Sequence, residues 1–124
     1  MKAFRVLVTG DRNWSDAALI QIELIKLIRP RKPSDVILIN GGARGADLLA
    51  KKIGEQLGFW VVMYEPSRNM WPAAGPIRNT WMLKEGLPNF VLAFHDDLRK
   101  SKGTKDMVKK VIRAGIPYRL IGHA

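Results

Sequence analysis

The 124-residue chain contains no cysteine, so it can form neither a disulfide nor a thiolate metal site. No stretch approaches the roughly 18 consecutive apolar residues of a membrane span, and MKAFRVLVTGDRNW has too short an apolar run for a signal peptide. The motifs GxGxxG, GxxxxGK[ST] and GxSxG are missing, which argues against a standard dinucleotide site, a P-loop and a serine elbow. We expect a cytoplasmic protein with no membrane contact and no resident cofactor.

Acidic residues are few relative to basic ones. The chain has 11 Asp and Glu against 21 Lys and Arg, for a formal net charge of +10. Such an excess favours a polyanionic partner such as nucleic acid, and it serves solubility equally well. The sequence shows no repeat, linker or low-complexity segment, so we expect residues 1–124 to form a single domain.

Five short apolar segments have the pattern of strands. Residues 4–10, 35–40 and 90–94 are continuous runs, typical of strands buried on both faces, and residues 59–64 and 118–121 are expected to flank them. The segments between them, 15–28, 46–57, 76–85 and 104–114, have helical spacing, with Ser15 placed to cap the first. Inward positions are predicted at Leu19, Ile22, Ile25 and Ile28, at Leu48, Leu49, Ile53 and Leu57, and at Val108, Val111 and Ile112.

Strands and helices alternate along the whole chain. Right-handed crossovers then require a parallel sheet with helices on both faces. We predict an α/β, Rossmann-like domain with a five-stranded parallel sheet in the order 3-2-1-4-5. Ligands of such folds bind outside the carboxyl ends of the strands, here near the switch point between strands 1 and 4.

The first two loops at that edge carry glycine and charge. Gly10 permits a tight exit from the first strand, and Asp11, Arg12 and Asn13 follow it with polar groups. In INGGARGADLLAKKIG, residues 39–54, the glycines lack Cβ atoms, so backbone N–H groups can approach an anion at the positive end of a helix. The predicted cradle consists of the backbone N–H groups around Gly42, Ala43, Arg44 and Gly45, and Gly41 is predicted to contact the ligand beside it. Asp47, in the first turn of that helix, either joins the site or complements the helix dipole.

The third and fourth loops add an arginine and a second helix start. Residues 67–79 form a long connection, and Arg78 can reach from it to a phosphate with a planar fork of donors. Because an arginine on an exposed helix packs against little, Arg78→Ala is expected to abolish binding with little loss of stability. Gly103 and Thr104 stand at the start of the last helix, where a second anion nest is predicted.

The remaining candidates are histidines, aspartates and tryptophans. His95 and His123 form no metal-ligand cluster with an acidic pair, so no metal site is expected, and Asp96 and Asp97 are interpreted as loop residues. Trp14 and Trp71 are placed either to stack on a base or to anchor a loop, whereas Trp60 and Trp81 are predicted to pack in the core. The stretch NMWPAAGPIRNTWML is either a lid or an interface between copies of the chain.

Four segments together resemble the SLOG superfamily, and most closely its YspA-like, cpYpsA-related branch. They are RVLVTGDRNW, INGGARGADLLA, AAGPIRNTWML and GTKDMVKKVIRAGIPY, in this order along nearly the whole chain. The resemblance implies a Rossmann-like domain that binds nucleotides or nucleotide-derived ligands. It also implies a homo-oligomer, since SLOG relatives are commonly dimers or larger.

Two groups of relatives imply different activities. In the Lonely-guy phosphoribohydrolases, which split the N-glycosidic bond of nucleoside 5′-monophosphates, an arginine and the motif PGGxGTxxE carry the site. Arg78 matches that arginine, and Gly103 and Thr104 match its GT, but Met107 stands where the glutamate belongs. Since methionine is neither an acid nor a base, Asp106 or Asp47 would have to replace it in such a hydrolase.

The other relative is the DprA (Smf) family, whose Rossmann core carries SGxARGID. GGARGAD at residues 41–47 is similar to it, and Arg78 and Asn79 repeat its RN pair. This resemblance implies a module that binds single-stranded nucleic acid, which the positive charge also favours.

The sequence therefore predicts binding of a nucleotide or nucleotide-like signal, with the hydrolase and the nucleic-acid module as alternatives. The predicted ligand-binding residues are Gly10, Asp11, Arg12, Gly41, Gly42, Ala43, Arg44, Gly45, Asp47, Arg78, Asn79, Gly103 and Thr104.

Overall fold

The computed structural model describes residues 2–65 and 74–123, and the strands in these ranges form one parallel five-stranded sheet. The strands are β1 (Phe4–Gly10), β2 (Val36–Asn40), β3 (Trp60–Met63), β4 (Phe90–Phe94) and β5 (Tyr118–Ile121). Their order is β3-β2-β1-β4-β5, so the predicted fold class and strand order are confirmed. Trp71 and most of the long third loop lie outside the described residues.

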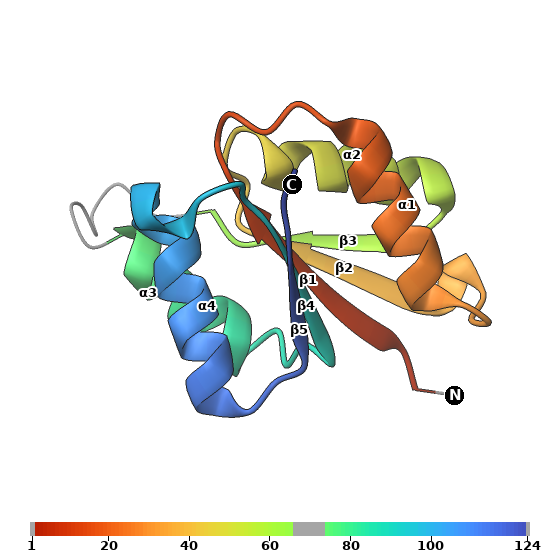
Figure 1. The fold of residues 1–124 in the computed structure, drawn as a ribbon. Coiled ribbons are helices and arrows are strands. Elements are labelled where there is room, and N and C mark those ends of the chain that lie inside the picture. Colours follow the sequence, from red (N-terminus) through yellow and green to blue (C-terminus); the bar gives the residue numbers. More distant parts are fainter. Residues whose placement is uncertain (1, 66–73, 124) are drawn as a thin grey trace.

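Helices cover both faces of the sheet (Figure 1). The helices α1 (Ala17–Ile28) and α2 (Ala46–Leu57) lie on one face, and α3 (Ala74–Lys84) and α4 (Gly103–Ala114) lie on the other. The central strand β1 serves both layers, because Val6 and Val8 pack beneath α1 and α2 while Leu7 packs with Met82 and Met107 of α3 and α4. A strand covered on both faces must be apolar throughout, which explains the continuous run from which β1 was predicted.

The first helix begins at a different cap from the predicted one. Asp16, not Ser15, caps α1, because its carboxylate oxygen accepts the Leu19 N–H at 3.1 Å. An N-cap side chain reaches the N–H three residues ahead, and Asp16 stands at that distance from Leu19. The buried face of the helix runs through Ile20, Leu24 and Ile28, so the predicted inward position of Ile22 is wrong.

Several other large apolar residues face outward against the prediction. Leu48 and Ile112 are exposed because α2 and α4 pack through neighbouring positions, in α2 through the small residues Ala46 and Ala50. Trp60 is 68% exposed, since β3 is an edge strand with a strand neighbour on one side only. Trp81 is also exposed, on α3, so its predicted position in the core is wrong.

Trp14 belongs to the core. Its ring lies 5.5 Å from the ring of Phe94 and stacks on the ring of His123 at 4.7 Å, and its indole N–H donates to the Asp16 carbonyl at 3.0 Å. Of the two predicted roles for Trp14, the structure supports the loop anchor. No helix within the described ranges is long and apolar enough to cross a membrane.

Candidate functional site

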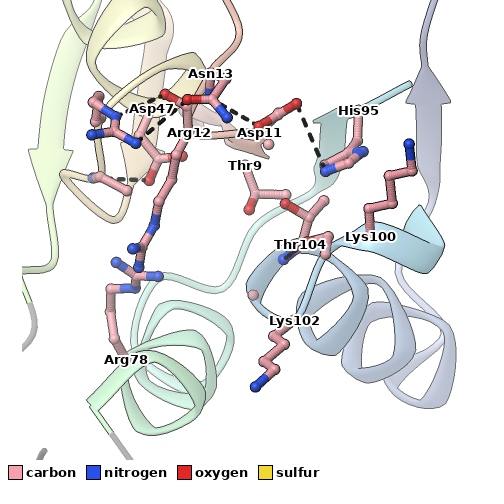
Figure 2. A pocket seen from close by; sticks show the side chains of 15 residues that line it. Thr9, Asp11, Arg12, Asn13, Asp47, Arg78, His95, Lys100, Lys102 and Thr104 are labelled. Carbon is pink, nitrogen blue, oxygen red and sulfur yellow. Dashed lines mark hydrogen bonds and ion pairs between the residues drawn. The ribbon is translucent and has the colours of Figure 1, made fainter. Parts of the chain in front are cut away.

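A cavity of about 250 Å³ opens where the carboxyl ends of β1 and β4 meet the first turns of α2 and α4 (Figure 2). This is the switch point of the strand order, where the fold was expected to bind a ligand. The lining residues come from four separate segments of the chain. They are Thr9, Gly10, Asp11, Arg12, Asn13, Ala43, Arg44, Asp47, Arg78, His95, Lys100, Ser101, Lys102, Gly103 and Thr104.

Two glycines of the site allow close contact between backbones. A Cβ atom at Gly10 would collide with the Phe94 carbonyl oxygen of the neighbouring strand and with Ala46. Gly45 has a φ of +83°, and a Cβ there would collide with the backbone of Asp11 and Arg12. These glycines therefore bring the start of α2 against the end of β1, which closes one wall of the cavity.

The N–H groups at the start of the glycine loop are already bonded within the protein. One carboxylate oxygen of Asp47 accepts the N–H of Gly41 at 2.8 Å and of Ala43 at 3.4 Å. The Gly42 N–H donates to the Asn40 side-chain oxygen at 2.8 Å. Asp47 thus occupies the place in which a ligand anion was predicted, so the cradle is not built from these N–H groups. Gly41, Gly42 and Gly45, although predicted to bind the ligand, are not among the residues that line the cavity.

Asp47 is a buried carboxylate that both closes the loop and lines the cavity. Its side chain belongs to a residue that is 3% exposed, and burial raises its pKa to about 6. The Gly41 N–H and the positive charge of Arg78 act against this rise without cancelling it. The aspartate therefore changes charge within two pH units of neutrality, which is unusual for this residue type.

Arg78 is buried, and the expectation of an exposed, solvated arginine is wrong. The residue is 8% exposed, and its Nη1 donates to the Gly41 carbonyl at 3.1 Å. The guanidinium lies against Gly41, where a Cβ would come within 2.8 Å of Nε and 2.9 Å of Cζ. Its Nε has no hydrogen-bond partner among the described residues. α3 thus places Arg78 against the glycine loop, which encloses this helix residue.

A second arginine reaches the same place. Arg12 extends from the loop after β1, and Figure 2 shows its side chain and that of Arg78 pointing toward one another. Burial lowers the pKa of Arg78, the charge of Asp47 opposes this effect, and the charge of Arg12 adds to it. Two guanidinium groups therefore share one carboxylate, which leaves a surplus of positive charge on this wall.

Arg44 braces the two loops that carry this charge. Its Nε donates to the Arg12 carbonyl at 3.2 Å and its Nη2 donates to the Asn13 side-chain oxygen at 3.4 Å. The side chain thereby spans from the glycine loop to the loop after β1. All three residues line the cavity, so this contact shapes its mouth.

The start of α4 forms the opposite wall. Thr104 is buried, and its N–H donates to the Ser101 hydroxyl at 3.0 Å. Asn79, also buried, donates from its side-chain amide to the Gly103 carbonyl at 3.1 Å and to the Asp106 carboxylate at 3.0 Å. Asn79 thus fastens α3 to α4 from behind and does not line the cavity, unlike the prediction.

The two carboxylates that the hydrolase alternative would require, Asp106 and Asp47, have different surroundings. Asp106 bonds to Asn79 and to Lys110, whose Nζ lies 2.8 Å from the carboxylate, and it does not line the cavity. Met107, at the position of the hydrolase glutamate, is fully buried in the core. Asp47, by contrast, lines the cavity from α2. The helix α4 therefore contributes its first turn, with Gly103 and Thr104, but no carboxylate to the cavity lining.

Several lining residues were not among the predicted ligand contacts, and His95 is the most informative. It immediately follows β4, so the rule that placed ligands at strand ends was sufficient to find it. The Asp97 N–H donates to its Nδ1 at 2.9 Å, and its Nε2 lies 3.9 Å from a carboxylate oxygen of Asp11. Within residues 2–65 and 74–123, no group of three or more His, Asp and Glu residues is arranged to hold a metal ion.

Comparisons with known proteins agree with the resemblance in the sequence. The model of the YspA, cpYpsA-related SLOG family matches residues 4–70. The Gene 61 protein of Mycobacterium phage D29 is 36% identical over 120 residues, covering 91% of this chain and 92% of that protein. The X-ray structure of DNA processing protein A (DprA) from Streptococcus pneumoniae superposes with a TM-score of 0.75 at 15% identity.

The DprA likeness covers 98% of this chain but 51% of that protein, so the chain spans about half the DprA length. At this low identity, the likeness shows a shared fold. The match to the family model and the identity with the phage protein show which family the chain belongs to. The chain belongs to the YspA, cpYpsA-related SLOG family.

Proposed function

We propose that the cavity binds the phosphate group of a nucleotide or nucleotide-derived ligand. The observation that carries this proposal is the convergence of Arg12 and Arg78 on one wall, with the Nε of the buried Arg78 unpartnered among the described residues. Guanidinium groups bind phosphate through planar pairs of N–H donors, and a phosphate dianion offsets the repulsion between two such cations. The dipole of α4, which starts at the opposite wall, favours the same charge.

The dimensions of the cavity favour a small phosphorylated group. Its volume of about 250 Å³ lies just below the range of about 300–1,000 Å³ that is usual for pockets of drug-sized ligands. A phosphate and its sugar therefore fill it, and a base extends outward.

Binding of AMP to an Arg12→Gln variant tests this proposal. Arg12 is exposed and its side chain makes no hydrogen bond within the described residues, so the variant removes a charge without disturbing the fold. We expect the variant to bind AMP at least about tenfold more weakly in calorimetric titrations, because a charge-assisted hydrogen bond is worth about 1.5–3 kcal/mol. Arg113→Gln removes an exposed charge away from the cavity and should bind normally. Equal affinities for both variants contradict the proposal.

Single-stranded nucleic acid is a second candidate ligand, favoured by cations beyond the cavity. Lys100 and Lys102 stand at its mouth, and Lys105 and Lys109 continue along the exposed side of α4. DprA, which shares the fold, is named as a DNA processing protein. When several cations bind the phosphate backbone of a nucleic acid, they displace counterions condensed on it. The affinity of such a complex therefore falls as the salt concentration rises.

An oligonucleotide titration separates this candidate from a small nucleotide. The nucleic-acid function predicts tight binding of a short single strand that weakens steeply with ionic strength, and a shallower salt dependence in a Lys105→Gln, Lys109→Gln variant. AMP affinity should not change in that variant, because neither lysine lines the cavity. Binding that is absent or insensitive to salt rejects this second candidate.

A further inference from the structure

A donor and an acceptor face each other across a gap in the cavity wall. The Nε2 of His95 lies 3.9 Å from a carboxylate oxygen of Asp11, which is beyond hydrogen-bonding distance. Both residues line the cavity, and both side chains are held in place by the backbone. The Asp97 N–H donates to His95 Nδ1 at 2.9 Å, and the Asn13 N–H donates to the other Asp11 oxygen at 2.9 Å.

These contacts determine what each side of the gap offers to a ligand. Because Nδ1 of His95 accepts a hydrogen bond, the ring carries its proton on Nε2 in the neutral state, so Nε2–H is a donor at the gap. The free Asp11 oxygen is an acceptor. A hydroxyl group is the ligand group that satisfies both, since it accepts one hydrogen bond while donating another.

We propose that the Asp11–His95 pair recognises a sugar hydroxyl of the bound ligand. The ligand class is then a phosphorylated ribose compound, a ribonucleotide or a ribose phosphate, with the phosphate at Arg12 and Arg78. This inference rests on the proposed phosphate site. Figure 2 shows Thr9 and Thr104 between Arg78 and His95, so the two recognition points lie at opposite ends of one cavity.

The Asp11–His95 pair distinguishes ligands that carry the hydroxyl from ligands that lack it, because its polar groups are largely shielded from water. The side chain of His95 is 9% exposed, and that of Asp11 is 29% exposed. A ligand that lacks the hydroxyl displaces water from the gap and leaves the donor and the charged acceptor without partners. Sites built to bind a hydroxyl reject analogues without it for this reason.

Calorimetric titration with AMP and with 2′,3′-dideoxy-AMP tests the inference. The two ligands carry the same phosphate and base and differ in the sugar hydroxyls. In the unmodified protein we expect the dideoxy compound to bind about tenfold to a hundredfold more weakly, because a hydrogen bond to a charged group is lost. In Asp11→Asn and in His95→Phe, the ratio between the two affinities should fall toward one.

His123→Gln is the matched control. His123 bonds to Asp96 and Asp16 and does not line the cavity, so this variant should keep the full ratio. If both nucleotides bind equally well and Arg12→Gln weakens both, the phosphate site stands and the hydroxyl recognition is refuted. A ratio that survives in Asp11→Asn and His95→Phe refutes it too. If neither nucleotide nor ribose 5-phosphate binds, the proposed function itself fails.

Discussion

The substitution Asp47→Asn probes how burial controls the charge at the glycine loop. Asparagine has the shape of aspartate and retains an oxygen that can accept the Gly41 and Ala43 N–H groups, but it cannot ionise. In the native protein, burial raises the Asp47 pKa from 3.8 to about 6. The folded chain therefore keeps a proton over a pH range in which the unfolded chain has released it.

The magnitude follows from this difference in proton binding. Stability falls with rising pH wherever the folded state binds more protons, at about 1.4 kcal/mol for each pH unit. Between pKa values of 3.8 and about 6, the free energy of unfolding should thus drop by about 3 kcal/mol. The asparagine variant imitates the protonated form, so it should lack this drop and be more stable than the native protein at pH 7.

Other groups with shifted pKa values act outside this interval. The pKa values of Asp16, Asp96 and Asp97 are lowered, chiefly by hydrogen bonds from His123 and Arg99, so their contributions disappear only as the pH falls below 3.8. The pKa of His123 is raised by its bonds to Asp16 and Asp96, so its contribution is complete below 6.5 and is lost at higher pH.

Urea denaturation between about pH 4 and pH 6, followed by tryptophan fluorescence, measures the effect. Trp14 is buried against Phe94 and reports the loss of the core. Asp97→Asn is the control, because it removes a partly exposed carboxylate paired with Arg99 and should keep the native slope. If Asp47→Asn also retains the native decline, another group is responsible and the argument from burial is refuted.

Arg78→Ala should lower the free energy of unfolding by about 2–3 kcal/mol, because it removes a charged hydrogen bond and leaves Asp47 with Arg12 alone as a neighbouring cation. A loss below about 0.5 kcal/mol in urea titrations would mean that Arg78 behaves as a surface residue. Gly10→Ala should destabilise the sheet strongly and Gly103→Ala should not, since only the first Cβ meets other atoms, and thermal melts of the two variants compare them directly. His123→Gln should cost stability at pH 6 and little at pH 9, a difference that denaturant titrations at both values reveal. Incubation with AMP should release no adenine detectable by chromatography, because α4 brings no carboxylate to the cavity and Asp47 is bonded to the Gly41 and Ala43 N–H groups. Release above an Arg78→Ala background would favour the hydrolase alternative.

The sequence by itself determined the fold and the edge of the sheet at which the cavity lies. Continuous apolar runs identify strands covered on both faces, and their alternation with helices leaves few topologies, since crossovers are right-handed. Because the carboxyl ends of parallel strands meet at one edge, residues as distant as Asp11, Ala43 and Thr104 could be assigned to one cavity. These inferences depend on local patterns and general rules, so they required no knowledge of packing.

The tertiary structure decided which residues are enclosed and what they contact. Apolar spacing alone did not show that α2 packs through Ala46 and Ala50, or that Trp60 stands on an open edge. Arg78 has a polar sequence environment, yet it is buried because α3 lies over a loop that is 37 residues away in the chain. The charge of Asp47 and the gap between Asp11 and His95 likewise depend on contacts between distant segments, which no local pattern specifies.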